Sequence, residues 1–131
     1  GEYDKAMEPW LLGYRKFIEV HNPQWTAIEK PFFSKVWGFA GTPDRFCQIG
    51  NRTAIIELKT GLPDPSHDLQ TAGQQVLVEE YYSTRVQDRY TLYLKPNDFR
   101  LVKHNGKTDK TVFLSLASAY QWKRTHKLTD R

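Results

Sequence analysis

Apolar side chains recur at helical spacing in three parts of the chain, which predicts three helices. The first covers about residues 4–20. The second covers residues 63–82, where Asp64 is placed to cap the helix and Pro65 suits its first helical position. The third covers residues 109–126. The predicted apolar faces are Met7, Trp10, Leu11, Tyr14, Phe17 and Ile18 in the first helix, Leu69, Ala72, Gly73, Val76, Leu77 and Tyr81 in the second, and Phe113, Leu116, Ala117 and Tyr120 in the third.

Runs rich in β-branched and aromatic residues lie between these helices and predict strands. In the first run, residues 26–34, Pro31 indicates an edge strand or a bulge. The element order is αβββα followed by ββα, which predicts an α/β sandwich on a mixed sheet, formed as one domain over residues 1–131. The remaining predicted strands cover residues 38–49, 52–60, 89–96 and 99–104.

Composition narrows the class of protein. Hydrophobic residues make up 39% and aromatic residues 14% of the 131 residues, as in a globular chain and unlike a disordered one. No apolar run is long enough to span a membrane, and the first ten residues are typical of the interior of a longer chain or of a chain trimmed at its start. The single cysteine, Cys47, excludes an internal disulfide framework and a cysteine-based zinc site, and it indicates a reducing, intracellular compartment.

Charge is unevenly distributed along the chain. Residues 1–84 contain 8 Lys and Arg against 11 Asp and Glu, a net charge of −3, whereas residues 85–131 contain 11 against 4, a net charge of +7. An acidic part joined to a basic part fits a metal centre beside a surface for a polyanion. It fits equally well a basic half that only keeps the protein soluble.

The run AIIELKTG, residues 54–61, places Glu57 and Lys59 on one face of a predicted strand, because residues two apart point to the same side. An isolated pair of this kind is most often an ion pair on a solvated surface. The neighbouring residues must decide between that interpretation and a functional site.

The turn Gly50-Asn51 sets the expected pairing of the strands on either side of it. A two-residue hairpin loop there pairs residues whose numbers sum to 101, so Asp44 lies opposite Glu57, unless a bulge at Pro43 shifts the register. Two carboxylates so placed repel each other and need a cation nearby. Carboxylates with a backbone carbonyl suit Mg²⁺ or Mn²⁺, and Lys59 can position or deprotonate a water, or stabilise charge on a phosphate.

The segments GFAGTPD, IIELKTG and HDLQTAGQ together resemble the PD-(D/E)xK nuclease superfamily, most closely its RecB-type branch, which includes small phage and bacterial exonucleases. The likeness covers about residues 27–82. It implies a restriction-endonuclease-like αβββαβ core, a three-layer-like sandwich in which helices flank a central mixed sheet. It also implies Mg²⁺ or Mn²⁺ as the cofactor, DNA as the substrate, and a cytoplasmic location in a bacterium or a phage-infected host.

The resemblance assigns roles to the charged residues of the hairpin. Asp44 and Glu57 resemble the metal-binding acids, Leu58 would contribute its backbone carbonyl, and Lys59 resembles the catalytic lysine.

The resemblance is less complete elsewhere. Glu29 occupies the place of an upstream acid that helps to bind a metal or its water, but it also fits a solvated strand residue. Gln70 resembles the catalytic-site glutamine of a Q-x-x-x-Y helix motif, in which Gln74 replaces the tyrosine. His67 shares the helix edge of these two glutamines and fits a polar first-turn residue better than a ligand. His21 receives no role.

The resemblance predicts a metal-dependent DNA exonuclease of recombination or repair. Alternatives are a DNA endonuclease, the nuclease module of a helicase–nuclease, or a DNA-binding domain that has lost catalysis, although the intact set of Asp44, Glu57 and Lys59 disfavours the last. An RNA-binding module has little support, because no RNA-binding motif is recognisable. The expected partners are DNA, a recombination or helicase protein and further copies of the chain, with no membrane association.

Overall fold

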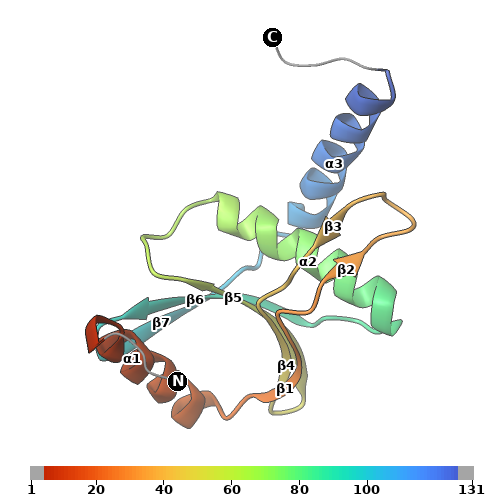
Figure 1. The fold of residues 1–131 in the computed structure, drawn as a ribbon. Helices are drawn as coiled ribbons and strands as arrows, with labels where there is room; N and C mark the ends of the chain where they lie inside the picture. Colours follow the sequence, from red (N-terminus) through yellow and green to blue (C-terminus); the bar gives the residue numbers. More distant parts are fainter. Residues whose placement is uncertain (1–4, 127–131) are drawn as a thin grey trace.

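The computed structural model describes residues 5–126, which form three α-helices and a five-stranded sheet (Figure 1). A short 3₁₀ turn, Lys5–Met7, leads into α1, Glu8–His21; α2 spans Ser66–Tyr82 and α3 spans Asp109–Thr125. All three predicted helices are confirmed, with ends that differ by a few residues. In this part of the chain, none of the helices has the length and apolar character that crossing a bilayer requires.

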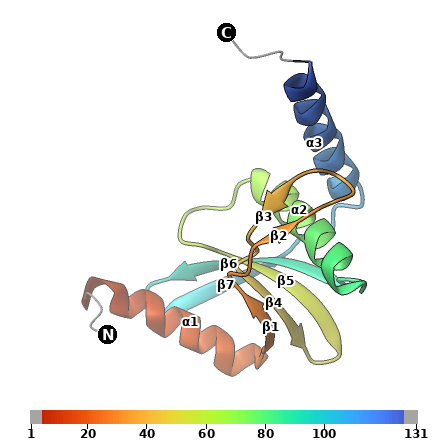
Figure 2. The same ribbon diagram turned by 45° about the vertical axis from the view of Figure 1, so that its right-hand side comes forward.

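The large sheet has the strand order β1-β4-β5-β6-β7, and a separate pair, β2 and β3, lies beside α2. β5 runs parallel to β6 and antiparallel to β4, because α2 joins β5 to β6 whereas a tight turn joins β4 to β5. With α1 on one face and α2 on the other, the predicted α/β sandwich with a restriction-endonuclease-like core is confirmed (Figures 1 and 2). The strands are β1 Gln24–Ile28, β2 Phe32–Phe33, β3 Ala40–Gly41, β4 Arg45–Ile49, β5 Arg52–Lys59, β6 Asp88–Lys95 and β7 Asp98–Lys103.

Two of the predicted strands are each divided into two, so the prediction of one continuous strand in each place was wrong. Residues 26–34 divide between β1 and β2 at Glu29, whose φ of 49° is left-handed and interrupts an extended run. Residues 38–49 divide between β3 and β4 at Thr42 and Pro43, where proline has no N–H to donate to a ladder. β1 is an edge strand and carries a bulge between Trp25 and Ala27, whereas Pro31, which indicated an edge strand or a bulge, lies beyond β1 in the connection to β2.

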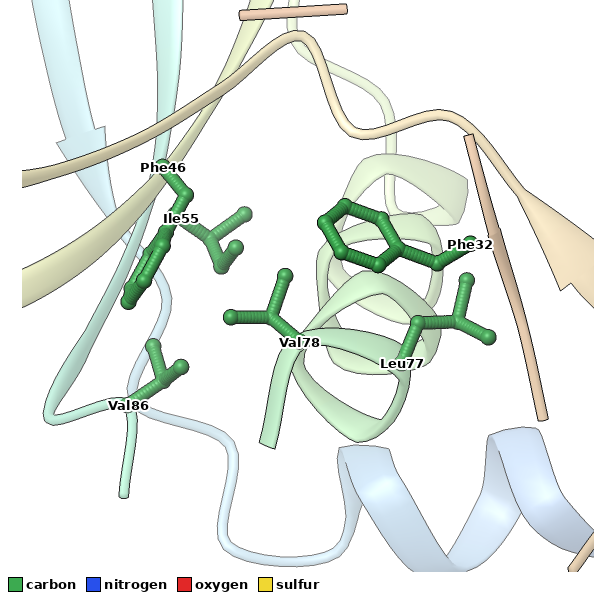
Figure 3. Close-up of a cluster of buried hydrophobic side chains, with 6 residues drawn as sticks. All are labelled: Phe32, Phe46, Ile55, Leu77, Val78 and Val86. Carbon is green, nitrogen blue, oxygen red and sulfur yellow. The ribbon is translucent and has the colours of Figure 1, made fainter. Parts of the chain in front are cut away.

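Alternation along β5 divides the core into two layers. Ala54 and Ile56 belong to the cluster that packs against α1, whereas Ile55 belongs to the cluster under α2. Because side chains two apart share a face, Glu57 and Lys59 follow Ile55 onto the α2 side. Figure 3 shows the α2-side cluster, which consists of Phe32, Phe46, Ile55, Leu77, Val78 and Val86.

The α2 helix begins at Ser66, one residue after the first helical position predicted for Pro65, and keeps most of its apolar face. Asp64 accepts the backbone N–H of Ser66 at 2.8 Å, but the N-cap position is Pro65, which makes no side-chain cap hydrogen bond, so the predicted cap and first helical position are each displaced by one residue. Ala72, Gly73, Val76 and Leu77 are buried as predicted, Leu69 is half-buried, and the predicted core position Tyr81 is 57% exposed.

The α3 helix packs much less than its apolar pattern predicted. Phe113 stacks edge-on against Phe39, with ring centroids 5.0 Å apart, and lies directly over Gly73 of α2. None of residues 109–125 is buried, and Leu116 and Tyr120 are 58% and 61% exposed. The helix leaves the sandwich rather than covering it, as Figure 1 shows, so most of its apolar face stays exposed.

Gly13 lies where α1 approaches the backbone of β6 and β7 closely, so a substitution there tests this packing. A Cβ at this position would collide with the backbone carbonyl of Asp98 and lie 2.7 Å from that of Lys95. Alanine normally favours a helix over glycine by about 1 kcal/mol. We expect the collision to reverse that sign, so that Gly13→Ala lowers the free energy of unfolding by at least about 2 kcal/mol.

Urea unfolding measures this difference. Gly61→Ala is the matched control, because no atom lies within 4 Å of the position of its Cβ. The control should change stability by less than about 1 kcal/mol. Equal stability of Gly13→Ala and the unsubstituted protein would contradict the packing described.

Candidate active site

The β4–β5 hairpin has the register that the turn predicted. Arg45 pairs with Ile56 and Ile49 pairs with Arg52, so the paired numbers sum to 101, and no bulge shifts them. Gly50 supplies the positive φ of 62° that the turn requires. The ladder ends one position before Asp44, which therefore lies at the mouth of the hairpin beside the end of β5.

Backbone contacts on both sides hold Asp44 in place. Its Oδ2 accepts the N–H of Leu58 at 2.8 Å, and its carbonyl oxygen accepts the N–H of Glu29 at 2.9 Å. The carboxylate is thus attached directly to the strand that carries Glu57, and its direction is set by main-chain groups rather than by a mobile side chain.

Glu57 is a buried acid with an incomplete set of partners. Glu57 is only 5% exposed, and Gln70 Nε2 donates a hydrogen bond to its Oε1 at 3.2 Å. Within residues 5–126, its Oε2 and the Oε1 of Gln74 are buried without any hydrogen-bond partner. Burial first, and then the neighbouring Asp44, raise the pKa of Glu57 to about 7, while Gln74 and Lys59 act in the opposite direction.

These atoms fit a divalent cation. A buried carboxylate oxygen without a donor, facing a second carboxylate, is stabilised either by a proton or by a metal ion. No group of three Asp, Glu, His or Cys side chains in the described part of the chain is arranged to hold a metal. Asp44 and Glu57 with the carbonyl of Leu58 would leave positions for water and substrate oxygens, an arrangement that Mg²⁺ accepts.

The structure does not bring the side chain of Glu29 into this pair. Glu29 is exposed and has a left-handed backbone, and it contacts Asp44 through its own N–H. Its part in metal binding therefore stays a prediction. A bound water would have to connect the Glu29 carboxylate to a cation held by Asp44 and Glu57.

Lys59 lies beside the acids at the end of β5. It is half-buried and pairs with Tyr93 in the parallel β5–β6 ladder, and its charge lowers the pKa of Glu57. The hydroxyl of Tyr93 in turn lies 2.8 Å from Nδ1 of His67. His67 thus belongs to a polar pair with Tyr93, whereas His21 packs against Phe17 on the α1 side of the sheet.

Gln74 is the residue that sequence reasoning left without a role. It is only 7% exposed and lies next to Glu57, one helical turn beyond Gln70. The signal was its i, i+4 spacing from Gln70, which places both amides on one side of α2. Both glutamines also line a hollow of about 240 Å³ that continues between Thr42 and Phe113.

Comparison with known proteins establishes the fold. No family profile and no curated protein matches the sequence. The crystal structure of a protein from Eubacterium rectale, named as a candidate exonuclease, aligns with a TM-score of 0.60 and 10% identity over 95% of this chain. The protein SSO0001 aligns with a TM-score of 0.52 and 18% identity over 91%. The chain shares their fold. It spans 54% and 57% of the lengths of those two chains.

The raised pKa of Glu57 predicts how stability depends on pH when no metal is present. The folded pKa of about 7 exceeds the ordinary value, so the folded state holds an extra proton at intermediate pH. Its stability therefore falls as pH rises from about 4.5 to about 7. Glu57→Gln removes this loss, and at pH 8 in EDTA it should be more stable than the unsubstituted protein by up to about 3 kcal/mol.

Urea unfolding at pH 5 and pH 8 measures this effect. Glu19→Gln, an exposed carboxylate on α1, is the matched control and should keep the original pH dependence. If Glu57→Gln kept it as well, the carboxyl of Glu57 would not be the group that burial and Asp44 perturb.

Proposed function

We propose that this chain is a divalent-metal-dependent DNA nuclease that hydrolyses phosphodiester bonds, most specifically as an exonuclease acting from DNA ends. The observation that carries the proposal is the buried Oε2 of Glu57, which has no partner in the described residues and lies beside Asp44 and Lys59. The fold, shared with a protein named as a candidate exonuclease, supports it.

The acids would hold the cation. Mg²⁺ or Mn²⁺ bound by Asp44, Glu57 and the carbonyl of Leu58 would neutralise charge on the scissile phosphate and lower the pKa of a bound water. The N–H of Leu58 keeps Asp44 directed toward this position, and the amide of Gln70 keeps Glu57 there. A bound cation would also oppose the effect of burial on Glu57 and favour its ionised form.

Lys59 would act on the substrate rather than on the metal. The Lys59 ammonium at the end of β5 is close enough to lower the pKa of Glu57. A protonated amine has no free lone pair, so it cannot be a metal ligand. Lys59 can therefore hold the attacking water or stabilise charge that develops on the phosphate. Gln70 and Gln74, which line the adjoining hollow, are neutral donors suited to orient a strand of DNA or a water.

The deciding experiment uses linear and closed-circular duplex DNA, each incubated with Mg²⁺, Mn²⁺ or EDTA. An exonuclease degrades only the linear form, and only with metal. Cleavage of both forms would replace the exonuclease proposal by an endonuclease. A protein that binds DNA but leaves both forms intact under all conditions would be a DNA-binding domain without catalysis, and the proposal would be wrong.

Asp44→Asn and Glu57→Gln should each abolish metal-dependent cleavage while leaving the fold intact. Each substitution replaces a carboxylate by an amide of nearly the same size, so packing is kept. Each also removes the repulsion between the two carboxylates. Calorimetric titration with Mn²⁺ should show weakened binding in both variants, and Glu19→Gln should bind as the unsubstituted protein does. Unchanged Mn²⁺ affinity in either variant would exclude that residue as a ligand.

Lys59→Ala should separate catalysis from metal binding. Single-turnover cleavage of a linear duplex should fall by about two to four orders of magnitude, since a positioned base or charge stabiliser is lost. Mn²⁺ affinity should stay within a few-fold, and Lys59→Arg should restore little, because a planar guanidinium cannot replace a compact ammonium. A surface ion pair predicts near-normal cleavage instead, so a rate within about threefold of the original would reject this role.

A further inference from the structure

A second cavity, of about 450 Å³, lies at the end of the sheet where β5 and β6 begin and β7 ends. Arg52, on its wall, precedes Glu57 by five residues, or about 16 Å along an extended strand. The cavity is therefore separate from the candidate active site. Its basic lining residues are Arg52, Arg85, Arg89, Lys103, Lys107 and Lys110.

Asp88 is the one carboxylate among the described residues that line this cavity. It is 4% exposed, and its two oxygens accept Arg52 Nε at 2.7 Å, Arg52 Nη2 at 3.0 Å and Lys103 Nζ at 3.0 Å. The guanidinium of Arg52 holds the pKa of Asp88 below its ordinary value, so Asp88 stays ionised. A single negative charge thus fixes two cations, whose side chains remain 54% and 45% exposed.

The other cations leave a surplus of positive charge. Arg89 pairs with Asp109 at 3.0 Å, and Lys110 pairs with Glu79 at 3.0 Å. Within residues 5–126, the side chains of Arg85 and Lys107 have no carboxylate partner. The six cations that line the cavity therefore have only three carboxylate partners, of which Asp88 alone lines it.

Like charges gathered around a cavity repel one another unless an anion enters. A phosphate group suits this cavity, because it carries high charge and several acceptor oxygens, and arginine binds it in a fork geometry. We propose that this basic cavity binds phosphate groups of a ligand, away from the phosphodiester that the carboxylate pair would cleave. The two sources of such groups are the backbone of a nucleic acid and a small polyphosphate.

The test reverses the charge of Arg85 and Lys107, the two cationic side chains of the cavity that have no carboxylate partner in the described residues. Arg85→Glu combined with Lys107→Glu changes exposed residues that take no part in the candidate active site. Lys5→Glu combined with Arg15→Glu is the matched control, with the same change in net charge at exposed positions in the N-terminal helical segment. Circular dichroism and thermal unfolding establish that both variants fold.

Two probes are titrated in EDTA and low salt, so that no metal-bound phosphate contributes. Inorganic tripolyphosphate is measured by calorimetry, and a labelled duplex is measured by fluorescence anisotropy. The unsubstituted protein and the control should bind, and the cavity variant should bind at least about tenfold more weakly. For the duplex, the slope of log affinity against log salt should also decrease by about 2.

The two probes name the source of the phosphate. Weakened duplex binding, with or without weakened tripolyphosphate binding, assigns the cavity to a nucleic-acid backbone. Weakened tripolyphosphate binding alone assigns it to a small ligand. Unchanged binding of both probes in the cavity variant, equal weakening in the control, or no binding by the unsubstituted protein would overturn the proposal. None of these outcomes depends on cleavage, so the nuclease proposal is tested separately through Asp44→Asn.

Discussion

Two carboxylates, Asp44 and Glu57, are held against each other by the register of the β4–β5 hairpin. Neither can move away, because Asp44 is bonded to the N–H of Leu58 and Glu57 belongs to a strand whose Ile55 and Ile56 are fully buried. The repulsion is therefore built into the fold and is relieved only by a proton or a cation. The core on both faces of β5 supplies the stability that this local conflict removes.

The parallel connection from β5 through α2 to β6 completes the site. It lays α2 across the face of the sheet that carries Glu57, so Gln70 and Gln74 meet the carboxyl group from above. These amides interrupt a helix face on which Leu77 and Val78 pack into the core under α2. Buried amides are costly unless they have partners, and the partnerless oxygen of Gln74 marks the place where a further donor or cation would fit.

Charge is organised differently at the two ends of the parallel strands. Glu57 and Asp88 are both buried acids, at 5% and 4% exposure, yet the pKa of the first is raised and that of the second is lowered. The difference comes from their neighbours, since Glu57 faces another acid whereas Asp88 faces Arg52 and Lys103. The two ends of the parallel strands therefore differ in local charge, one around the pair Asp44 and Glu57 and the other around Asp88 and its cations.

The sequence by itself determined whatever depends on local spacing. Helical periodicity located the three helices, and the Gly50-Asn51 turn set the register that opposes Asp44 to Glu57, because a two-residue loop allows only one pairing. Only the tertiary structure decided where extended segments break, that α3 leaves the core, and that Gln74 lies beside Glu57. These outcomes depend on which elements pack together. A pattern of apolar and polar residues predicts that a helix or strand has an apolar face, but it does not predict which element covers that face.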